Sequence, residues 1–344
     1  MRVAVVGYGY WGPNIARALA KLVGPRNVLI CERQQERLDQ AARDLPEAPQ
    51  TTDWADVLRC EDISAVALCT PAATHFDLAM QALAARKHLF VEKPIVTSTT
   101  EAIALADEAE RREQVLMVGH VFRYLPAVNA LRSLISEGKL GELRYLHSDR
   151  TSLGPRARED VTVVWDYLIH DVYLLPWLTG RPVSSVRALG GCYLRPDVED
   201  VVFAQWDLGA GVIASSRASW YDPEKVRRLV VVGSSAMAVL DDLQPDARLT
   251  LFRRGYVPFE GIDDFGNQGL HLFDEGGETV PTADAEPLLE ECREFLSAIE
   301  KRQPLPQGRD EIVVTTAVCE TVERSLKTGQ QETVPPSTNG RTKP

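Results

Sequence analysis

The chain has 344 residues, more than one hydrophobic core usually supports, so its length predicts two domains. Its apolar fraction of 44% and charged fraction of 25% are typical of globular proteins and argue against a disordered chain or a fibrous repeat. The net charge of −11 would repel a phosphate backbone, which argues against nucleic acid as a partner.

The cysteines and the apolar runs bear on the cellular compartment of the protein. The six cysteines lie far apart and form no C-x-x-C pair, unlike those of a zinc knuckle or a dense disulfide framework. The first apolar run has four residues, too short for a signal peptide, and no stretch approaches the roughly 18 to 20 apolar residues of a membrane span. We therefore expect a cytoplasmic protein with reduced thiols and no membrane partner.

Short apolar runs alternate with helical segments in the first third of the chain. Continuous runs suit strands buried on both faces, and they predict strands at residues 3–6, 28–30, 65–69, 88–91 and 115–118. Apolar residues three and four apart predict helices between them, at residues 14–22, 34–45, 75–87 and 98–114. This alternation predicts a doubly wound parallel α/β sheet of the Rossmann type.

The first predicted strand runs into a glycine-rich turn, Gly7-Tyr8-Gly9-Tyr10-Trp11-Gly12, and Pro13 then suits the first turn of a helix. Glu32 follows Gly12 by twenty residues, at the end of the second strand. Such glycines let a pyrophosphate approach the helix N-terminus, and an acid at this distance accepts hydrogen bonds from ribose hydroxyls. The motif predicts a dinucleotide site; the alternative is a structural turn with a solvated Glu32.

The residues at the end of the second strand bear on the choice of cofactor. Glu32 favours NAD, because a carboxylate repels the additional phosphate of NADP. Arg33 beside it could bind that phosphate, so NADP is the alternative.

Glu92-Lys93-Pro94 ends the fourth predicted strand, at the carboxyl edge of the sheet where ligands of open α/β folds bind. Pro94 fixes its own φ and favours an extended Lys93, which would hold the ammonium group in place. The alternative is a surface Glu-Lys pair before a proline turn.

The stretch WDYLIHD, residues 165–171, reads as a buried helix that carries Asp166 and His170 one turn apart. Both side chains should leave the same face, while Asp171 should point about 100° away and serve as a cap or salt-bridge partner. The alternative is a helix acid with a satisfied core histidine. Asp166 and His170 alone are too few ligands for a metal site, so no metal site is predicted. An apolar stripe should anchor the helix, formed by Trp165, Leu168, Ile169 and Val172.

Strand-like runs separated by Gly, Pro and Asp turns fill much of the second half. Six such runs can form one sheet, at residues 185–195, 200–208, 211–220, 227–234, 237–243 and 248–254. The polar end of the chain predicts disorder.

Three segments, residues 70–94, 118–146 and 286–306, resemble the Gfo/Idh/MocA family of sugar and inositol oxidoreductases, including its Glu-Lys-Pro signature. The resemblance implies a Rossmann domain over residues 1–122 and an α/β domain over residues 123–330, built on an open, mostly antiparallel sheet. Residues 331–344 would be a disordered tail. In the family the second domain lines the substrate cleft and often forms the oligomer interface, which implies a homo-dimer or homo-tetramer.

The resemblance also implies the site. Asp166 and His170 match the family's Asp-x-x-x-His, which lies near the lysine matched by Lys93, although the glycines common in that motif are replaced here by bulky residues. The pKa of a histidine, about 6.5, makes His170 the natural proton acceptor, while Lys93 could stabilise an alkoxide or share the proton transfer. Which of the two is the base is left open. Further cofactor contacts would be Thr70, Pro71, His75 and Glu92, and further substrate contacts Arg123, Tyr124 and Trp165.

The implied activity is NAD-dependent oxidation of a secondary hydroxyl on a sugar ring. The favoured substrate is a UDP-sugar such as UDP-N-acetylglucosamine, oxidised at C3 to the 3-keto sugar for polysaccharide or lipopolysaccharide biosynthesis. One alternative is an inositol or free-sugar dehydrogenase. The non-enzyme alternative is a dinucleotide-binding regulator.

Overall fold

The computed structural model describes residues 1–154, 161–262, 266, 268–303, 305 and 308–336, and the chain divides into two compact units. The first unit is built chiefly from Met1–Tyr124 and Glu286–Glu320, and the second from Leu125–Ala285 and Thr321–Val334. The predicted boundary at residue 122 therefore lies close to Tyr124. The segment Glu286–Glu320, which we expected in the second domain, belongs to the first unit.

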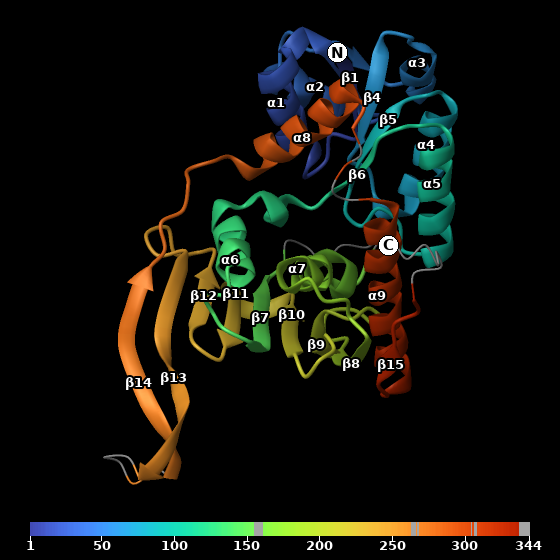
Figure 1. Ribbon diagram of the computed structural model, residues 1–344. Coiled ribbons are helices and arrows are strands. Elements are labelled where there is room, and N and C mark those ends of the chain that lie inside the picture. Colours follow the sequence, from blue (N-terminus) through green and yellow to red (C-terminus); the bar gives the residue numbers. More distant parts are fainter. Residues whose placement is uncertain (155–160, 263–265, 267, 304, 306–307, 337–344) are drawn as a thin grey trace. The chain divides into compact units, whose positions relative to one another are not determined.

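The first unit contains a six-stranded parallel sheet in the order β3-β2-β1-β4-β5-β6, of which Figure 1 labels β1, β4, β5 and β6. Its strands are β1 Arg2–Val6, β2 Val28–Cys31, β3 Gln50–Thr51, β4 Ile63–Leu68, β5 His88–Glu92 and β6 Leu116–Gly119. This order is that of doubly wound dinucleotide-binding folds, so the predicted Rossmann sheet is confirmed. The short strand β3 was not predicted.

The helices of the first unit connect its strands or follow from the end of the chain. Those of the N-terminal stretch are α1 Gly12–Val23, α2 Gln35–Asp44, α3 Trp54–Arg59, α4 His75–Ala84 and α5 Thr99–Arg111. Short 3₁₀ turns lie at Pro25–Asn27, Ala72–Thr74 and Val121–Tyr124. From the C-terminal part come α8 Pro287–Lys301 and the first part of α9 Arg309–Thr328.

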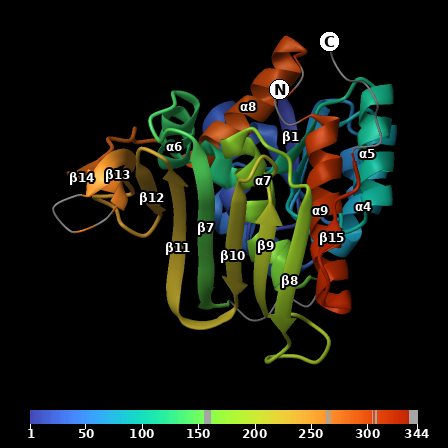
Figure 2. The same ribbon diagram turned by 60° about the horizontal axis from the view of Figure 1, so that its bottom comes forward.

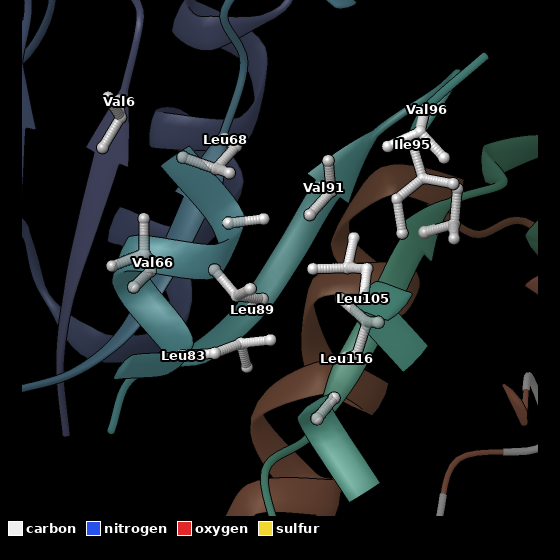
Figure 3. Packing of buried hydrophobic residues seen from close by; sticks show 14 of the residues in the cluster. Val6, Val66, Leu68, Leu83, Leu89, Val91, Ile95, Val96, Leu105 and Leu116 are labelled. Atoms are coloured by element: carbon white, nitrogen blue, oxygen red, sulfur yellow. The ribbon is translucent and has the colours of Figure 1, made fainter. Parts of the chain in front are cut away.

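Apolar side chains cover both faces of this sheet. On one face Leu68 and Val91 of the strands pack with Leu83 of α4 and Leu105 of α5 (Figure 3). On the other face α8 completes the core, and the ring of Phe90 meets that of Phe295 edge to face at 5.8 Å. Full burial of one such side chain stabilises the fold by about 1.5–3 kcal/mol. These contacts explain why the C-terminal segment belongs to the first unit.

The second unit contains a nine-stranded sheet in the order β14-β13-β12-β11-β7-β10-β9-β8-β15 (Figure 2). All neighbours pair antiparallel except β7 and β10, so the predicted mostly antiparallel sheet is confirmed. β13 and β14 form a long hairpin (Figure 1). The strands are β7 Leu143–Leu153, β8 Ser185–Gly191, β9 Val201–Asp207, β10 Ile213–Ser219, β11 Tyr221–Gly233, β12 Met237–Asp241, β13 Leu249–Ile262, β14 Gln268–Thr279 and β15 Glu332–Thr333.

Helical segments of the second unit are α6 Pro126–Ser136, a π-helix Val164–Leu168 and α7 Ile169–Thr179, and the end of α9 from Thr321 also belongs to it. The π-helix packs against β10. α7 ends at Gly180, whose φ of 67° is left-handed and whose N–H donates to the carbonyl of Pro176 at 2.8 Å.

The end of the chain differs from the predicted disordered tail. Glu332 and Thr333 pair with β8, and the N–H of Val334 donates to the carbonyl of Ser184 at 3.0 Å. The prediction of disorder from residue 331 was therefore wrong for residues 332–334, because the edge of β8 forms hydrogen bonds with them. Residues 337–344 of the predicted tail lie outside the described residues.

Candidate functional site

The three glycines of the loop after β1 have different reasons to be glycine. Gly7 has a left-handed φ of 91°, and a Cβ there would lie 2.9 Å from the carbonyl of Cys69. A Cβ on Gly12 would lie 2.1 Å from the carbonyl oxygen of Gly7. A Cβ on Gly9 would meet nothing closer than the guanidinium of Arg37 at 3.7 Å, an ordinary contact. Packing of the loop requires Gly7 and Gly12, whereas Gly9 leaves the backbone open to a ligand.

Glu32 follows β2 directly and is held beside this loop. Its carboxylate accepts hydrogen bonds from the N–H groups of Tyr8 at 2.7 Å and Gln34 at 3.0 Å, and it lies 3.6 Å from the guanidinium of Arg37. Burial raises the pKa of Glu32, but these hydrogen bonds and the Arg37 charge outweigh it, so the pKa is lower than usual. The side chain is therefore ionised at neutral pH.

These features fit a bound NAD. The first turn of α1 offers backbone N–H groups to a pyrophosphate, and Gly9 leaves room for it. The ionised Glu32 can accept from ribose hydroxyls and would repel the 2′-phosphate of NADP. Arg33 and Tyr10 are exposed, and Trp11 contacts the ring of Tyr10 edge to face. The sequence did not identify Arg37 as a neighbour of Glu32. The one feature that could have suggested it is the position of Arg37 in the first turn of α2.

His75 joins the loops that follow β4 and β5. One ring nitrogen, Nδ1, lies 2.9 Å from the carbonyl oxygen of Pro94, and Nε2 lies 2.9 Å from that of Thr70. The Thr70 hydroxyl also accepts from Thr74 at 2.8 Å. His75 is 1% exposed, so the structure gives it a role in holding these loops. Contacts of Thr70, Pro71 and His75 with the cofactor stay predictions.

Glu92 and Lys93 are both buried at the carboxyl end of β5. The Lys93 N–H donates to the Glu92 carboxylate at 3.2 Å, and the Lys93–Pro94 peptide bond is cis. The alternative of a solvated surface pair does not fit this burial.

Arg123 and Tyr124 are bound to the C-terminal helices. Arg123 donates to both carboxylate oxygens of Glu311, at 2.7 and 2.9 Å, and the Tyr124 hydroxyl donates to Glu294. Burial raises the pKa of Glu311, but His120 and Arg123 beside it lower that pKa further than burial raises it. Burial lowers the pKa of His120, a residue that the sequence did not single out. Substrate contacts of Arg123 and Tyr124 stay predictions.

Glu291 of α8 is a buried acid close to this group. It is 0% exposed, and the backbone N–H of His120 lies close to its carboxyl group. Burial raises the pKa of Glu291 well above its usual value, and the negative charge of Glu92 raises it further. The Glu291 carboxyl group is therefore harder to ionise than an exposed glutamate.

In the second unit, Asp166 and His170 are buried at the start of the helix that carries them. Asp166 accepts from the indole N–H of Trp220 at 3.1 Å, and His170 Nδ1 lies 3.0 Å from the Tyr173 hydroxyl. An unbroken α-helix was expected here. Instead Asp166 lies in the π-helix, whose wider turn is closed by the N–H of Ile169 donating to the carbonyl of Val164, five residues back.

Asp171 has the structural role predicted for it. Its carboxylate accepts from the Ser148 hydroxyl at 2.9 Å and from Arg150 at 3.0 Å, which fixes the start of α7 to β7.

The predicted apolar stripe is buried as well, and the Trp165 indole donates to Glu323 of α9 at 2.6 Å. A substrate contact of Trp165 stays a prediction.

The predicted catalytic residues come from both units. Lys93 belongs to the first, and Asp166 and His170 to the second, where the structure brings them onto one helical segment. That all three act on one substrate stays a prediction.

The described residues contain neither a cluster of metal-binding side chains nor a helix of membrane-spanning type. No group of three or more His, Cys, Asp or Glu in this part of the chain could hold a metal ion. No helix within the same residues is long and apolar enough to cross a membrane.

Comparison with known proteins relates both units to one family. Residues 1–120 match the oxidoreductase family with an NAD-binding Rossmann fold, and residues 128–239 match the GFO/IDH/MocA C-terminal domain. UDP-N-acetylglucosamine 3-dehydrogenase of Acidithiobacillus ferrooxidans is 31% identical over 308 residues, 89% of this chain and 90% of that protein. The scyllo-inositol 2-dehydrogenase (NAD(+)) of Bacillus subtilis is 28% identical over 278 residues, 77% of this chain and 80% of its own.

Solved structures show the same fold over nearly the whole chain. The structure of the Acidithiobacillus ferrooxidans enzyme has a TM-score of 0.80 at 29% identity and covers 96% of this chain and 98% of its own. Levoglucosan dehydrogenase in complex with NADH and L-sorbose has a TM-score of 0.81 at 19% identity. The match covers 98% of this chain and 100% of that one.

Proposed function

Since the chain belongs to the Gfo/Idh/MocA family of oxidoreductases, we propose that it oxidises C3 of a UDP-sugar such as UDP-N-acetylglucosamine to the 3-keto sugar. The chain is an NAD-dependent oxidoreductase acting on a CH–OH group. The observation that supports the finer proposal is the similarity, over 89% of the chain, to a UDP-N-acetylglucosamine 3-dehydrogenase.

The proposed reaction removes a hydride and a proton from one secondary alcohol. NAD, when bound, accepts the hydride. His170 accepts the hydroxyl proton, and Lys93 stabilises the negative charge that develops on the oxygen. Asp166, held by the Trp220 indole, accepts a hydrogen bond from a substrate hydroxyl. The buried surroundings of all three strengthen these interactions.

A panel assay tests the substrate. Purified protein is incubated with NAD and UDP-sugars, inositols or free hexoses, and NADH absorbance is followed. We expect turnover with UDP-N-acetylglucosamine and competition by UDP alone. Turnover of an inositol without competition by UDP would instead support the second candidate, which the similarity to inositol dehydrogenases favours. Absence of turnover with every compound would favour a dinucleotide-binding regulator.

Two substitutions test the catalytic roles. Lys93→Ala and His170→Ala should each lower kcat by at least about a hundredfold, within the range of general acid-base catalysis, while NADH binds nearly as before. The exposed residues Lys225 and His271 provide matched controls, as Lys225→Ala and His271→Ala. Full turnover in either test variant would contradict the role assigned to that residue.

We also propose a homo-dimer or homo-tetramer in the cytoplasm. Exposed apolar side chains on neighbouring strands of the second sheet support the oligomer: Tyr145 pairs with Ile213, and Leu189 with Phe203. The cysteines lie far apart in the sequence and form no C-x-x-C pair, which agrees with a reducing compartment. Light scattering that gave the mass of one chain at working concentration would contradict the oligomer.

A further inference from the structure

The neighbour of His170 in the second unit is a tyrosine of the same helix. The Tyr173 hydroxyl lies 3.0 Å from Nδ1, and the two rings meet edge to face with centroids 5.8 Å apart. His170 is 7% exposed and Tyr173 is 3% exposed, so little bulk water competes for the bond. Residues three apart on a helix are neighbours on its surface, so α7 itself sets this pair.

A phenol can donate or accept, and the two arrangements have different chemical consequences. If the phenol donated to Nδ1, the single proton of a neutral imidazole would be on Nε2, and that nitrogen could not accept another. If Nδ1–H donates to the phenol oxygen, Nε2 has the lone pair that a base needs. This second bond also survives proton transfer, because Nδ1 keeps its hydrogen in the imidazolium form.

We propose that Tyr173 is a positioning residue for His170, whose phenol oxygen accepts from Nδ1–H and so keeps Nε2 as the proton acceptor. This rests on the proposed function, in which His170 takes the hydroxyl proton. The Asp171 contacts with Ser148 and Arg150 hold the same helix against β7, so the pair is fixed to the sheet. Asp166 precedes His170 by one turn and Asp171 follows it directly, and neither charged group changes in the variant below.

The tautomer of His170 can be measured without substrate. The ¹⁵N shifts of the ring, assigned by comparison with His170→Ala, should show the Nδ1–H tautomer near neutral pH in the wild-type protein. A wild-type Nε2–H tautomer would overturn the proposal, whatever the variants do. Because this readout needs no turnover, it decides the proposal even if the protein oxidises none of the sugars tried, an outcome that would count against the proposed function alone.

Tyr173→Phe keeps the ring and removes only the hydroxyl. It should shift the tautomer toward Nε2–H, lower kcat about tenfold, as expected from loss of one hydrogen bond, and move the acidic limb of the kcat profile. The Kd for NADH and the Tm should stay close to wild type. Tyr256→Phe, at an exposed position of β13, is the matched control. Unchanged tautomer, kcat and pH profile in Tyr173→Phe would overturn the proposal.

Discussion

The position of the Glu32 carboxylate is set by backbone rather than by its own rotamer. The N–H groups of Tyr8 and Gln34 bind its two oxygens, and the first of them belongs to the glycine loop. Each oxygen can accept a further hydrogen bond. The hydrogen bond from Tyr8 therefore both ties Glu32 to the glycine loop and holds its carboxylate where it could accept from a ribose hydroxyl.

Glu32→Ala should raise the Kd for NADH by about ten- to a hundredfold, because hydrogen bonds to a charged group contribute about 1.5–3 kcal/mol. Binding of NADPH should weaken less, since the repulsion of its additional phosphate is lost with the carboxylate. Fluorescence titration of both cofactors measures this. Glu36→Ala, at an exposed position in the first turn of α2, should leave both Kd values unchanged. Equal effects of the two substitutions would contradict a ribose contact.

Glu291 predicts a pH dependence of stability with a definite sign. Burial raises its pKa in the folded protein, so its contribution to stability is fully present below the ordinary carboxyl pKa of 4.5 and is lost as the pH rises toward the folded value. Glu291→Gln is neutral at every pH and lacks this loss. As the pH rises above 4.5, the unfolding free energy of the wild type should therefore fall relative to that of the variant.

Urea denaturation at several pH values measures that difference. Glu290→Gln is the control, because Glu290 is the preceding residue of α8 and is partly exposed beside Arg293. Parallel pH profiles for wild type and Glu291→Gln would show that Glu291 ionises normally in the folded protein.

At the scale of elements, the turn between β1 and α1 separates structural from ligand-related glycines. Gly12→Ala places a Cβ 2.1 Å from a backbone oxygen that cannot yield, and it should destabilise the protein by about 1–3 kcal/mol or more. Gly9→Ala meets only an ordinary contact and should leave the Tm nearly unchanged while it weakens NADH binding. Thermal melts and NADH titrations of both variants compare them. A Gly9→Ala variant that binds NADH normally would contradict close approach of the cofactor there.

The elements that the sequence predicted are those with a strong local pattern. Continuous apolar runs identified β1, β2, β4, β5 and β6 because buried parallel strands are apolar on both faces. β3 has two residues, Gln50 and Thr51, and no apolar pattern at all. β7 was missed because polar residues such as Ser148, Asp149 and Arg150 follow one another along it, and their partners lie on distant strands and on α7.

The candidate site was predictable in its residue types but not in its local geometry. Local spacing suggested that Asp166 and His170 lie on one helix, and they do lie on one continuous helical segment, Asp166 in its π-helical part and His170 in α7. Local propensity carries no signal for the π-helix, which depends on how the segment packs against β10. Trp220 could not be assigned to Asp166, because the two residues are 54 positions apart in the sequence. Arg37 is near Glu32 in the sequence, but local pattern does not show which side chain of α2 turns back toward that carboxylate.

At the scale of the whole molecule, the first unit is assembled from separate stretches of chain. Its sheet needs Cys292, Phe295 and Leu296 of α8 on one face and Ile312 and Val313 of α9 on the other. We expect residues 1–124 alone to remain unfolded and not to bind NADH. A single chain that joins residues 1–124 to residues 286–320 by a flexible linker should recover helical circular dichroism and NADH binding. Cooperative folding of residues 1–124 alone would contradict this view of the core.

The interleaving of the two units also sets an order of events during synthesis. Translation proceeds from the N-terminus at about 5–20 residues per second, so the first sheet leaves the ribosome well before α8 and α9 do. During that interval its apolar face lacks the side chains that cover it in the finished protein. We therefore expect the first unit, with its cofactor site, to reach its final packing only after α8 and α9 have been made.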